Sequence, residues 1–343
     1  MAQIVGGIGM AHSSLVVAPE PEMWAAHNRI DRENPHLRTK AGAPATYAEL
    51  EQLQGTQYLE ESSPEYLNGQ IKLTVAAVTR LREDLERLKP DVLIVFGDDQ
   101  EEMHTPENHP TLAIFEGATF TMGTSLRFVT YEQVLGDATP MMEGYAMDAR
   151  HEFPGHAGLA KHLSRSLREQ GIELESVTSI PDDGETGIGH AFGIMETQLM
   201  HTAGAIPLIP VLVNTYWEPN QLPVSESYDL GLAVRKAVES FPEDLRVVVI
   251  ASGGLSHFNT DEDLDQRVLN ACRVHDEAAL RGLDPAQLNG GSSEIRNWIA
   301  TAAACRDVPF VWDEYIPVYR TPAGTGIGLA FSLWSADGAT TSA

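Results

Sequence analysis

The chain has 343 residues, of which 43% are hydrophobic, and this is ample for a sizeable buried core in one α/β domain or two small ones. The formal net charge of −26 disfavours binding to nucleic acid and to anionic membranes, because phosphate contacts need clustered lysine and arginine. The sequence has neither an apolar run of about twenty residues nor a basic-then-apolar leader, so we expect a cytoplasmic protein without a membrane span or signal peptide.

Apolar runs of strand length alternate with helical patterns along the chain. We expect strands at residues 92–96, 112–115, 126–130, 174–180, 206–214, 247–251 and 327–333, with a further strand-like run at 4–8. Helical patterns occupy residues 71–88, 156–169, 230–240 and 263–280. Because crossover helices let strands run parallel and remain covered, this alternation predicts an α/β fold. We expect a single domain, 1–343, with a central mixed sheet flanked by helices.

Residues 19–68 differ from the rest of the chain. This segment contains Trp24, Pro35, Pro44 and Tyr47 together with several acidic residues, and it has little strand signal. We interpret it as a mainly helical insertion. It is either a lid over a site or a solvated surface segment without a role in function.

Three residues that are distant in the sequence have side chains suited to metal chemistry. His12 follows the apolar run 4–8, and His257 follows the predicted strand 247–251 in a glycine-rich loop. Open α/β sheets place their sites just beyond strand ends. If folding brings these two histidines together with Glu294, the three residues supply two metal ligands and one group that can carry a proton.

A helix is predicted to begin close to Glu294. Either Ser292 or Ser293 would be a favourable N-cap residue. The apolar residues within 295–299 have helical spacing, which turns Glu294 toward the edge of the buried face.

Motifs of several other enzyme classes are missing from the sequence. It contains no Walker loop, no Gly-x-Ser-x-Gly motif and no His-Glu-x-x-His motif, so phosphate transfer on a P-loop, α/β-hydrolase activity and zincin activity lose their support. Cys272 and Cys305 are too few for a disulfide framework or a thiolate cluster, and we expect both to be buried in the core.

Four segments of the chain resemble one enzyme family. The most specific is Glu-Ser-Phe-Pro-Glu-Asp-Leu at 239–245, which is followed by a strand pattern and by Gly-Gly-Leu-Ser-His at 253–257. The others are residues 155–163, 214–216 and 319–323. With these segments the chain resembles the class III (type II), LigB-like extradiol ring-cleavage dioxygenases, a superfamily that includes the catalytic subunit of protocatechuate 4,5-dioxygenase. The similarity covers most of the chain outside residues 19–68.

The resemblance implies a mononuclear Fe(II) site held by two histidines and one glutamate. His12 matches the first iron ligand and Glu294 the carboxylate ligand, whereas His257 matches the catalytic histidine that accepts the proton of a substrate hydroxyl. Such a ligand set leaves open positions where a catechol-type diol and O2 can meet. An imidazole suits proton transfer because its ordinary pKa, about 6.5, lies near working pH.

The chain departs from the family pattern at two histidines. The family's second iron histidine falls on Gln100, whose carbonyl oxygen is a weaker ligand, so that His104, His27 or His36 could replace the imidazole instead. Where the family has Asp-His-Gly, this chain reads Asp-Asp-Gly at 182–184, and a histidine recurs only at His190, a second catalytic candidate.

The predicted function is therefore extradiol cleavage of a catechol-type, carboxylated aromatic by Fe(II) and O2. We expect Tyr216, Arg38 and Tyr319 to contact the substrate, with Arg38 of the insertion supplying a cation for the carboxylate. A lid within the same chain would suggest a homo-oligomer, by analogy with relatives that are capped by a separate subunit. Two alternatives stay open: a metal-assisted hydrolase or lyase on the same scaffold, and a metal-free binding protein.

Overall fold

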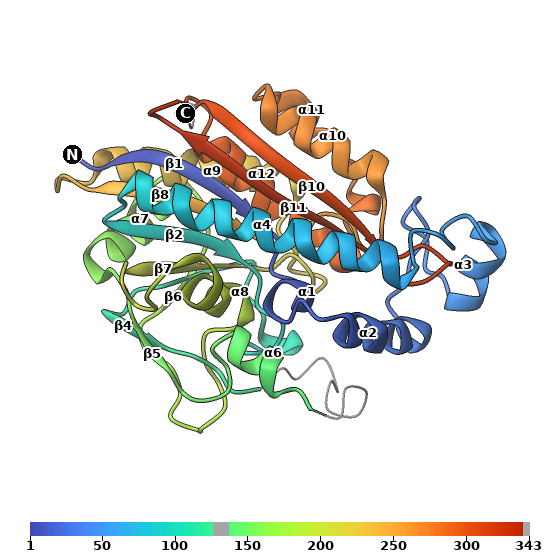
Figure 1. The fold of residues 1–343 in the computed structure, drawn as a ribbon. Helices are drawn as coiled ribbons and strands as arrows, with labels where there is room; N and C mark the ends of the chain where they lie inside the picture. The colour runs from blue at the N-terminus through green and yellow to red at the C-terminus, as the bar shows by residue number, and fades with distance from the viewer. Residues whose placement is uncertain (126–136, 339–343) are drawn as a thin grey trace.

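The computed structural model describes residues 1–125 and 137–338, and its centre is a mixed β-sheet of nine strands (Figure 1). The strands span Gln3–Met10 (β1), Val92–Gly97 (β2), Leu112–Phe115 (β3), Glu175–Val177 (β6), Leu208–Val213 (β7), Arg246–Ser252 (β8), His257–Asn259 (β9), Phe310–Tyr319 (β10) and Thr325–Ser335 (β11). Their order is β10-β11-β1-β8-β2-β7-β3-β6, and β9 pairs with β11 beside this path. Strands β1, β8, β2 and β7 run parallel to their neighbours within this group, whereas β11 and β3 flank the group in antiparallel orientation. A separate ribbon is formed by Thr119–Thr121 (β4) and Glu152–Pro154 (β5).

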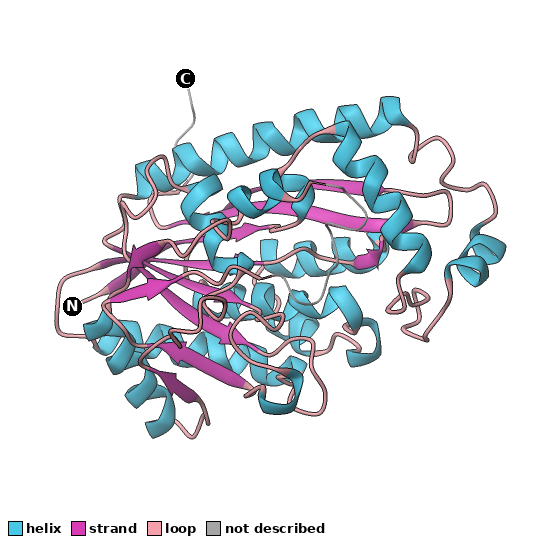
Figure 2. Cartoon of the chain, turned by 90° about the horizontal axis from the view of Figure 1, so that it is seen from below, coloured by secondary structure: helices cyan, strands magenta, loops and turns pink. Residues whose placement is uncertain are grey.

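Helices cover both faces of the sheet, which Figure 2 shows as a layer between them. One face is packed by Ala157–Glu169 (α7), Val224–Ser240 (α9), Glu262–Arg273 (α10), Glu277–Arg281 (α11) and Ile295–Ala304 (α12). The other face is packed by Ser14–Val17 (α1), Pro64–Leu88 (α4), Thr139–Gly144 (α6), His190–Ile194 (α8) and the π-helical turn Met195–Leu199 (η2). Short 3-10 turns lie at Pro106–Asn108 (η1), Pro285–Gln287 (η3) and Gly290–Glu294 (η4). Within residues 1–125 and 137–338, no helix is long and apolar enough to cross a membrane.

The two hydrophobic cores follow from the alternation of side chains along the central strands. In β2, Val92, Ile94 and Phe96 belong to the core under α7, α9 and α12, whereas Leu93 and Val95 belong to the core under α4. All five are fully buried, so the strand reads as a continuous apolar run rather than an alternating one.

The predicted α/β fold with a central mixed sheet is confirmed, and the differences lie at particular elements. The predicted helix 263–280 is two helices, α10 and α11, separated at a turn where His275 has a positive φ of 53°. The predicted strand 174–180 shortens to β6, and the one at 126–130 lies outside the described residues. The edge strand β10 was missed, because its half-exposed residues and Pro317 weaken the strand pattern. Both cysteines are buried, as predicted.

The segment near the N-terminus is helical, as predicted, and it forms one end of the molecule (Figure 1). It contains Pro21–Glu33 (α2) and Tyr47–Gln54 (α3). Helix α4 begins earlier than expected, because Ser63 caps its N-terminus and Pro64 occupies its first turn. The segment is joined to the rest of the protein by a buried ion pair between Asp31 and Arg320.

Candidate active site

The four adjacent parallel strands all end at the same edge of the sheet, and each is followed by a residue of one cavity. His12 follows β1, Gln100 follows β2, Tyr216 follows β7 and His257 follows β8. Carboxyl ends of parallel strands are where open α/β sheets bind their ligands. The topology therefore assembles this site from short loops on rigid strands.

The cavity has a volume of about 360 Å³, within the ordinary range for small-molecule sites. Its wall includes residues from the sheet edge, from the helical segment near the N-terminus and from the turn after β10. The lining residues are His12, Ser13, Ser14, His27, Ile30, Asp31, Glu33, Asn34, Pro35, His36, Gln100, Tyr145, His190, Tyr216, Trp217, His257, Phe258, Gly291, Glu294, Arg320 and Ile327.

His12 presents its Nε2 to the cavity. Its Nδ1 lies 3.1 Å from the hydroxyl of Ser252, and that hydroxyl donates its only hydrogen to the carbonyl oxygen of Ala191 at 2.6 Å. Nδ1 of His12 must therefore be the donor, so Nε2 is the ring nitrogen that can bind a metal ion. Nε2 lies 3.2 Å from Oε2 of Glu294 and 3.8 Å from Oδ1 of Asp98.

Glu294 is buried between the two histidines predicted from the sequence. Its Oε2 accepts a hydrogen bond from the backbone of Gly254 at 2.8 Å, and its Oε1 lies 3.1 Å from Nε2 of His257. A Cβ atom on Gly253 would lie 2.9 Å from Cβ of Glu294, so this approach requires glycine. Burial alone would raise the pKa of Glu294, but the charges of His257 and His12 outweigh it and hold the pKa well below its ordinary value.

Helix α12 begins at Ile295, next to Glu294 as predicted, but it lacks the expected serine N-cap. Residues 290–294 form a 3-10 turn, and Glu294 itself precedes α12 without a side-chain cap. Neither serine serves as the N-cap, because both hydroxyls have other partners. Ser292 Oγ accepts from the backbone N–H of His257 at 3.1 Å, and Ser293 Oγ lies 3.2 Å from the hydroxyl of Thr215.

His257 is held in one orientation by the residues around it. Its Nδ1 donates to the carbonyl oxygen of Leu255 at 2.9 Å, which directs Nε2 toward Glu294. The ring packs so closely on Gly291 that a Cβ there would lie 2.0 Å from the ring. Burial alone would lower the pKa of His257, but the carboxylate of Glu294 outweighs burial and raises it.

The loop after β2 brings a second carboxylate into the site. Gln100 donates from Nε2 to Oδ2 of Asp98 at 2.6 Å and, at 3.4 Å, to Oε1 of Glu294. Oδ1 of Asp98 is buried and has no hydrogen-bond partner among the described residues. Burial and the nearby charge of Glu294 both raise the pKa of Asp98.

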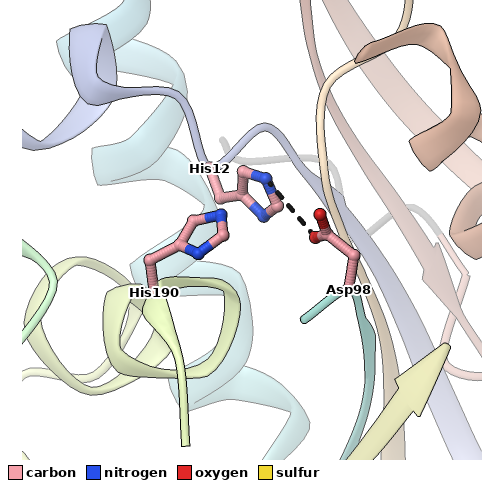
Figure 3. A group of neighbouring side chains, drawn as sticks. All are labelled: His12, Asp98 and His190. Carbon is pink, nitrogen blue, oxygen red and sulfur yellow. Dashed lines mark ion pairs between the residues drawn. The ribbon is translucent and has the colours of Figure 1, made fainter. Parts of the chain in front are cut away.

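His190 lies beside His12, and Figure 3 shows the two imidazoles together with Asp98. The ring centroids of His12 and His190 are 4.6 Å apart. Nδ1 of His190 donates to Oε1 of Glu102, which leaves Nε2 as the other ring nitrogen. Burial would lower the pKa of His190, but Glu102, with smaller effects of Asp98 and Glu294, raises it to about 9.

These donor atoms fit a divalent metal ion. One ligand atom each from His12, Asp98 and His190 lie within 4.8 Å of one another, and Glu294 adds a carboxylate oxygen 3.2 Å from His12. Nε2 of His12 faces two carboxylates, and one of these has an oxygen without a hydrogen-bond partner in the described chain. Buried groups of this kind are paired with cations in proteins, because an uncompensated buried charge is costly.

The three other candidate histidines occupy different places. His104 belongs to a separate buried cluster with Asp99 and His109, in which Asp99 Oδ2 accepts from Nδ1 of His104 at 2.7 Å. Asp99 also accepts from three backbone N–H groups of its own loop and so stabilises the conformation of that loop. His27 and His36 both line the cavity; Nε2 of His27 lies 2.6 Å from the hydroxyl of Ser14.

Two of the three residues expected to contact substrate lie outside this cavity. Tyr319 donates its hydroxyl to Glu262 at 2.6 Å and stacks on Tyr58. Consecutive residues at a strand end point to opposite sides, and it is the next residue, Arg320, that lines the cavity. Arg38 lines a neighbouring cavity of about 30 Å³ that shares His257 with the larger one. Tyr216 does line the main cavity, and burial raises its pKa to about 12.

Sequence reasoning missed Asp98 and Arg320. Asp98 lies two residues after the predicted strand 92–96, a position like that of His12, but the family pattern has its histidine at Gln100. Arg320 had no such signal, because its partner Asp31 is 289 residues away; Nε and Nη2 of Arg320 donate to that carboxylate at 2.8 and 3.0 Å.

Comparisons with known proteins agree on one family. The family described as "Catalytic LigB subunit of aromatic ring-opening dioxygenase" matches residues 56–323. Gallate dioxygenase of Pseudomonas putida is 33% identical over 156 residues, which cover 39% of this chain and 43% of that protein. The 2,3-dihydroxyphenylpropionate/2,3-dihydroxicinnamic acid 1,2-dioxygenase of Mycolicibacterium smegmatis is 31% identical over 105 residues, 31% of each chain. The chain thus spans less than half the length of each of these relatives.

Proposed function

Because this chain belongs to the LigB family of catalytic subunits of aromatic ring-opening dioxygenases, we propose that it is an Fe(II)-dependent extradiol dioxygenase that opens a catechol-type aromatic ring with O2. The observation that carries the proposal is the meeting of His12, His257 and Glu294 in one cavity, although 245 and 37 residues separate them along the sequence. Each has the side chain that the proposed reaction needs at that place.

His12 and Glu294 are the residues that we propose hold the iron. His12 offers Nε2 because Ser252 fixes its protonation on Nδ1, and Glu294 is kept ionised by the charges around it. Bound there, Fe(II) would supply Lewis acidity toward the two hydroxyls of a catechol and a redox partner for O2.

His257 is the proposed proton acceptor for a substrate hydroxyl. Its Nδ1 donates to a backbone carbonyl, so Nε2 is the nitrogen available for accepting a proton and returning it later. His190, held through Nδ1 by Glu102, is the proposed second proton carrier. Two imidazoles with such fixed orientations can serve two different oxygen atoms of one substrate.

The proposed substrate is a small, carboxylated catechol. Tyr216, Trp217 and Phe258 supply aromatic wall for the ring, and the relatives' names refer to carboxylated aromatics. The guanidinium of Arg320 is paired with a carboxylate inside the cavity. Arg38 lines the adjoining small cavity, which shares His257 with the main one, and its Nε has no hydrogen-bond partner in the described part of the chain. We therefore propose that a substrate carboxylate reaches Arg38 where the two cavities meet.

The test is oxygen uptake by protein loaded anaerobically with Fe(II). We expect a carboxylated catechol, gallate or 2,3-dihydroxyphenylpropionate among them, to cause O2 consumption and formation of a yellow ring-opened product. The matched control is a resorcinol with the same carboxyl group, whose 1,3-hydroxyls cannot chelate one ion. His257→Gln should keep the iron and lower kcat by about 10²–10⁴-fold, the ordinary contribution of general acid–base catalysis. Tight iron binding without O2 uptake for any catechol would refute the proposal.

A further inference from the structure

The loop after β2 has a glutamine where the family pattern predicts the second iron histidine, and its geometry suggests how the site is completed. The following inference rests on the proposed function, because it concerns the ligands of the same metal ion. Its evidence is the arrangement of Asp98, Gln100 and Glu294 around the open side of His12.

Gln100 has the orientation of a positioning residue rather than a ligand. Its amide nitrogen faces Oδ2 of Asp98 at 2.6 Å and Oε1 of Glu294 at 3.4 Å. Only an N–H group is stable between two carboxylates, since a carbonyl oxygen there would be repelled by both. An amide nitrogen that donates has no lone pair for a metal, so Gln100 links the two carboxylates through its side chain.

Asp98 has the free donor atom that Gln100 lacks. The residue is 1% exposed, and the hydrogen bond from Gln100 uses Oδ2. Oδ1 has no hydrogen-bond partner among the described residues and lies 3.8 Å from Nε2 of His12 (Figure 3). A buried carboxylate oxygen without a donor, close to the imidazole nitrogen that can bind a metal, is the arrangement expected around a cation.

We propose that Asp98 is the third protein ligand of the metal, in place of the family's second histidine, and that Gln100 positions Asp98 and Glu294. The protein would then hold the ion with one imidazole and two carboxylates. Carboxylates favour hard ions such as Mn(II), whereas imidazoles favour ions such as Fe(II). Relative to a two-histidine site, the site therefore discriminates less strongly against Mn(II).

The test measures metal affinity in the absence of substrate. Fe(II) and Mn(II) dissociation constants are determined by anaerobic equilibrium dialysis for the wild type, Asp98→Asn and Gln100→Ala. We expect Asp98→Asn to weaken Fe(II) binding by more than about 100-fold and Mn(II) binding by a larger factor, because a carboxylate ligand is lost. Gln100→Ala should weaken both by a similar factor of about 10–100, as is typical for residues that orient ligands.

The control is Asp84→Asn, which makes the same replacement at a buried aspartate of α4. Asp84 accepts a hydrogen bond from Trp312 at 2.9 Å outside the cavity, so the metal affinities should not change. If Asp98→Asn does not fold, iron X-ray absorption of the wild type tests the proposal instead, because it reports the number of coordinated imidazoles. One coordinated imidazole supports the proposal, whereas two would show that His190 fills the position. Unchanged affinity in Asp98→Asn would also overturn it.

The two proposals can fail separately. Tight metal binding that depends on Asp98, combined with no O2 uptake for any catechol, would refute the dioxygenase reaction and leave the ligand assignment standing. O2-dependent ring opening with metal affinity that is insensitive to Asp98→Asn would refute the ligand assignment and leave the dioxygenase reaction standing.

Discussion

Replacing Glu196 by glutamine should remove a pH-dependent loss of stability. Glu196 lies in η2, is 1% exposed and is not part of the cavity wall. Its Oε2 accepts a hydrogen bond from the backbone of Gly204 at 2.7 Å, whereas its Oε1 has no hydrogen-bond partner among the described residues. Burial raises the pKa of Glu196 from 4.5 to about 7, although the hydrogen bond from Gly204 acts in the opposite direction.

The sign and size of the effect follow from this shift. A carboxyl group whose pKa is higher in the folded state contributes its full stability below the unfolded pKa and loses that contribution as the pH rises through the folded pKa. For Glu196 this window runs from pH 4.5 to about pH 7. The whole shift corresponds to about 3.4 kcal/mol, of which roughly 2 kcal/mol is lost between pH 5.5 and pH 8.

The assay is urea unfolding of the wild type and Glu196→Gln at pH 5.5 and pH 8. The free energy of unfolding of the variant, minus that of the wild type, should rise by about 2 kcal/mol between the two pH values. Glu226→Gln, at an exposed site on α9, is the control and should show a constant difference. The same difference at both pH values for Glu196→Gln would refute the reasoning.

Three further predictions concern the cavity and its supports. Asp31→Asn should lower the free energy of unfolding by about 3–5 kcal/mol, because Arg320 is left buried without its carboxylate; a loss below about 1 kcal/mol in urea unfolding would contradict this. Ser252→Ala should weaken Fe(II) binding by about 10–100-fold, because Nδ1 of His12 loses the hydroxyl that fixes its protonation; dialysis that returns wild-type affinity would exclude that role. Gly291→Ala should destabilise the protein by about 1–3 kcal/mol and lower kcat, because its Cβ would lie 2.0 Å from the neighbouring imidazole ring; thermal unfolding and O2 uptake check both effects.

The central strands were predictable because they are buried on both faces. Residues 92–96 and 247–251 are continuous apolar runs, and the structure extends each by only one or two residues. Patterns failed where burial was partial. Strand β10 is half-exposed at the sheet edge, and the break between α10 and α11 depends on a left-handed residue within an otherwise helical pattern.

Within the site, positions after strands could be predicted but side-chain directions could not. His12 and His257 follow apolar runs, and the parallel topology brings both to one edge of the sheet. The roles of Asp98 and Gln100 depend on which atom of each faces the other, and spacing along a loop contains no information on that. The pairing of Asp31 with Arg320 likewise depends on packing between the two ends of the chain.

The place of β1 in the sheet has a consequence for synthesis on the ribosome. β1 lies between β8, which begins at Arg246, and β11, which begins at Thr325. Strand β1 thus pairs only with strands that are made much later, a non-local pairing of the kind that slows folding and leaves strand edges exposed to aggregation. His12 emerges long before Glu294, so a nascent chain cannot bring both residues together around an ion until Glu294 has been made. The order of residues along the chain thus keeps the proposed metal site incomplete during most of the synthesis of these residues.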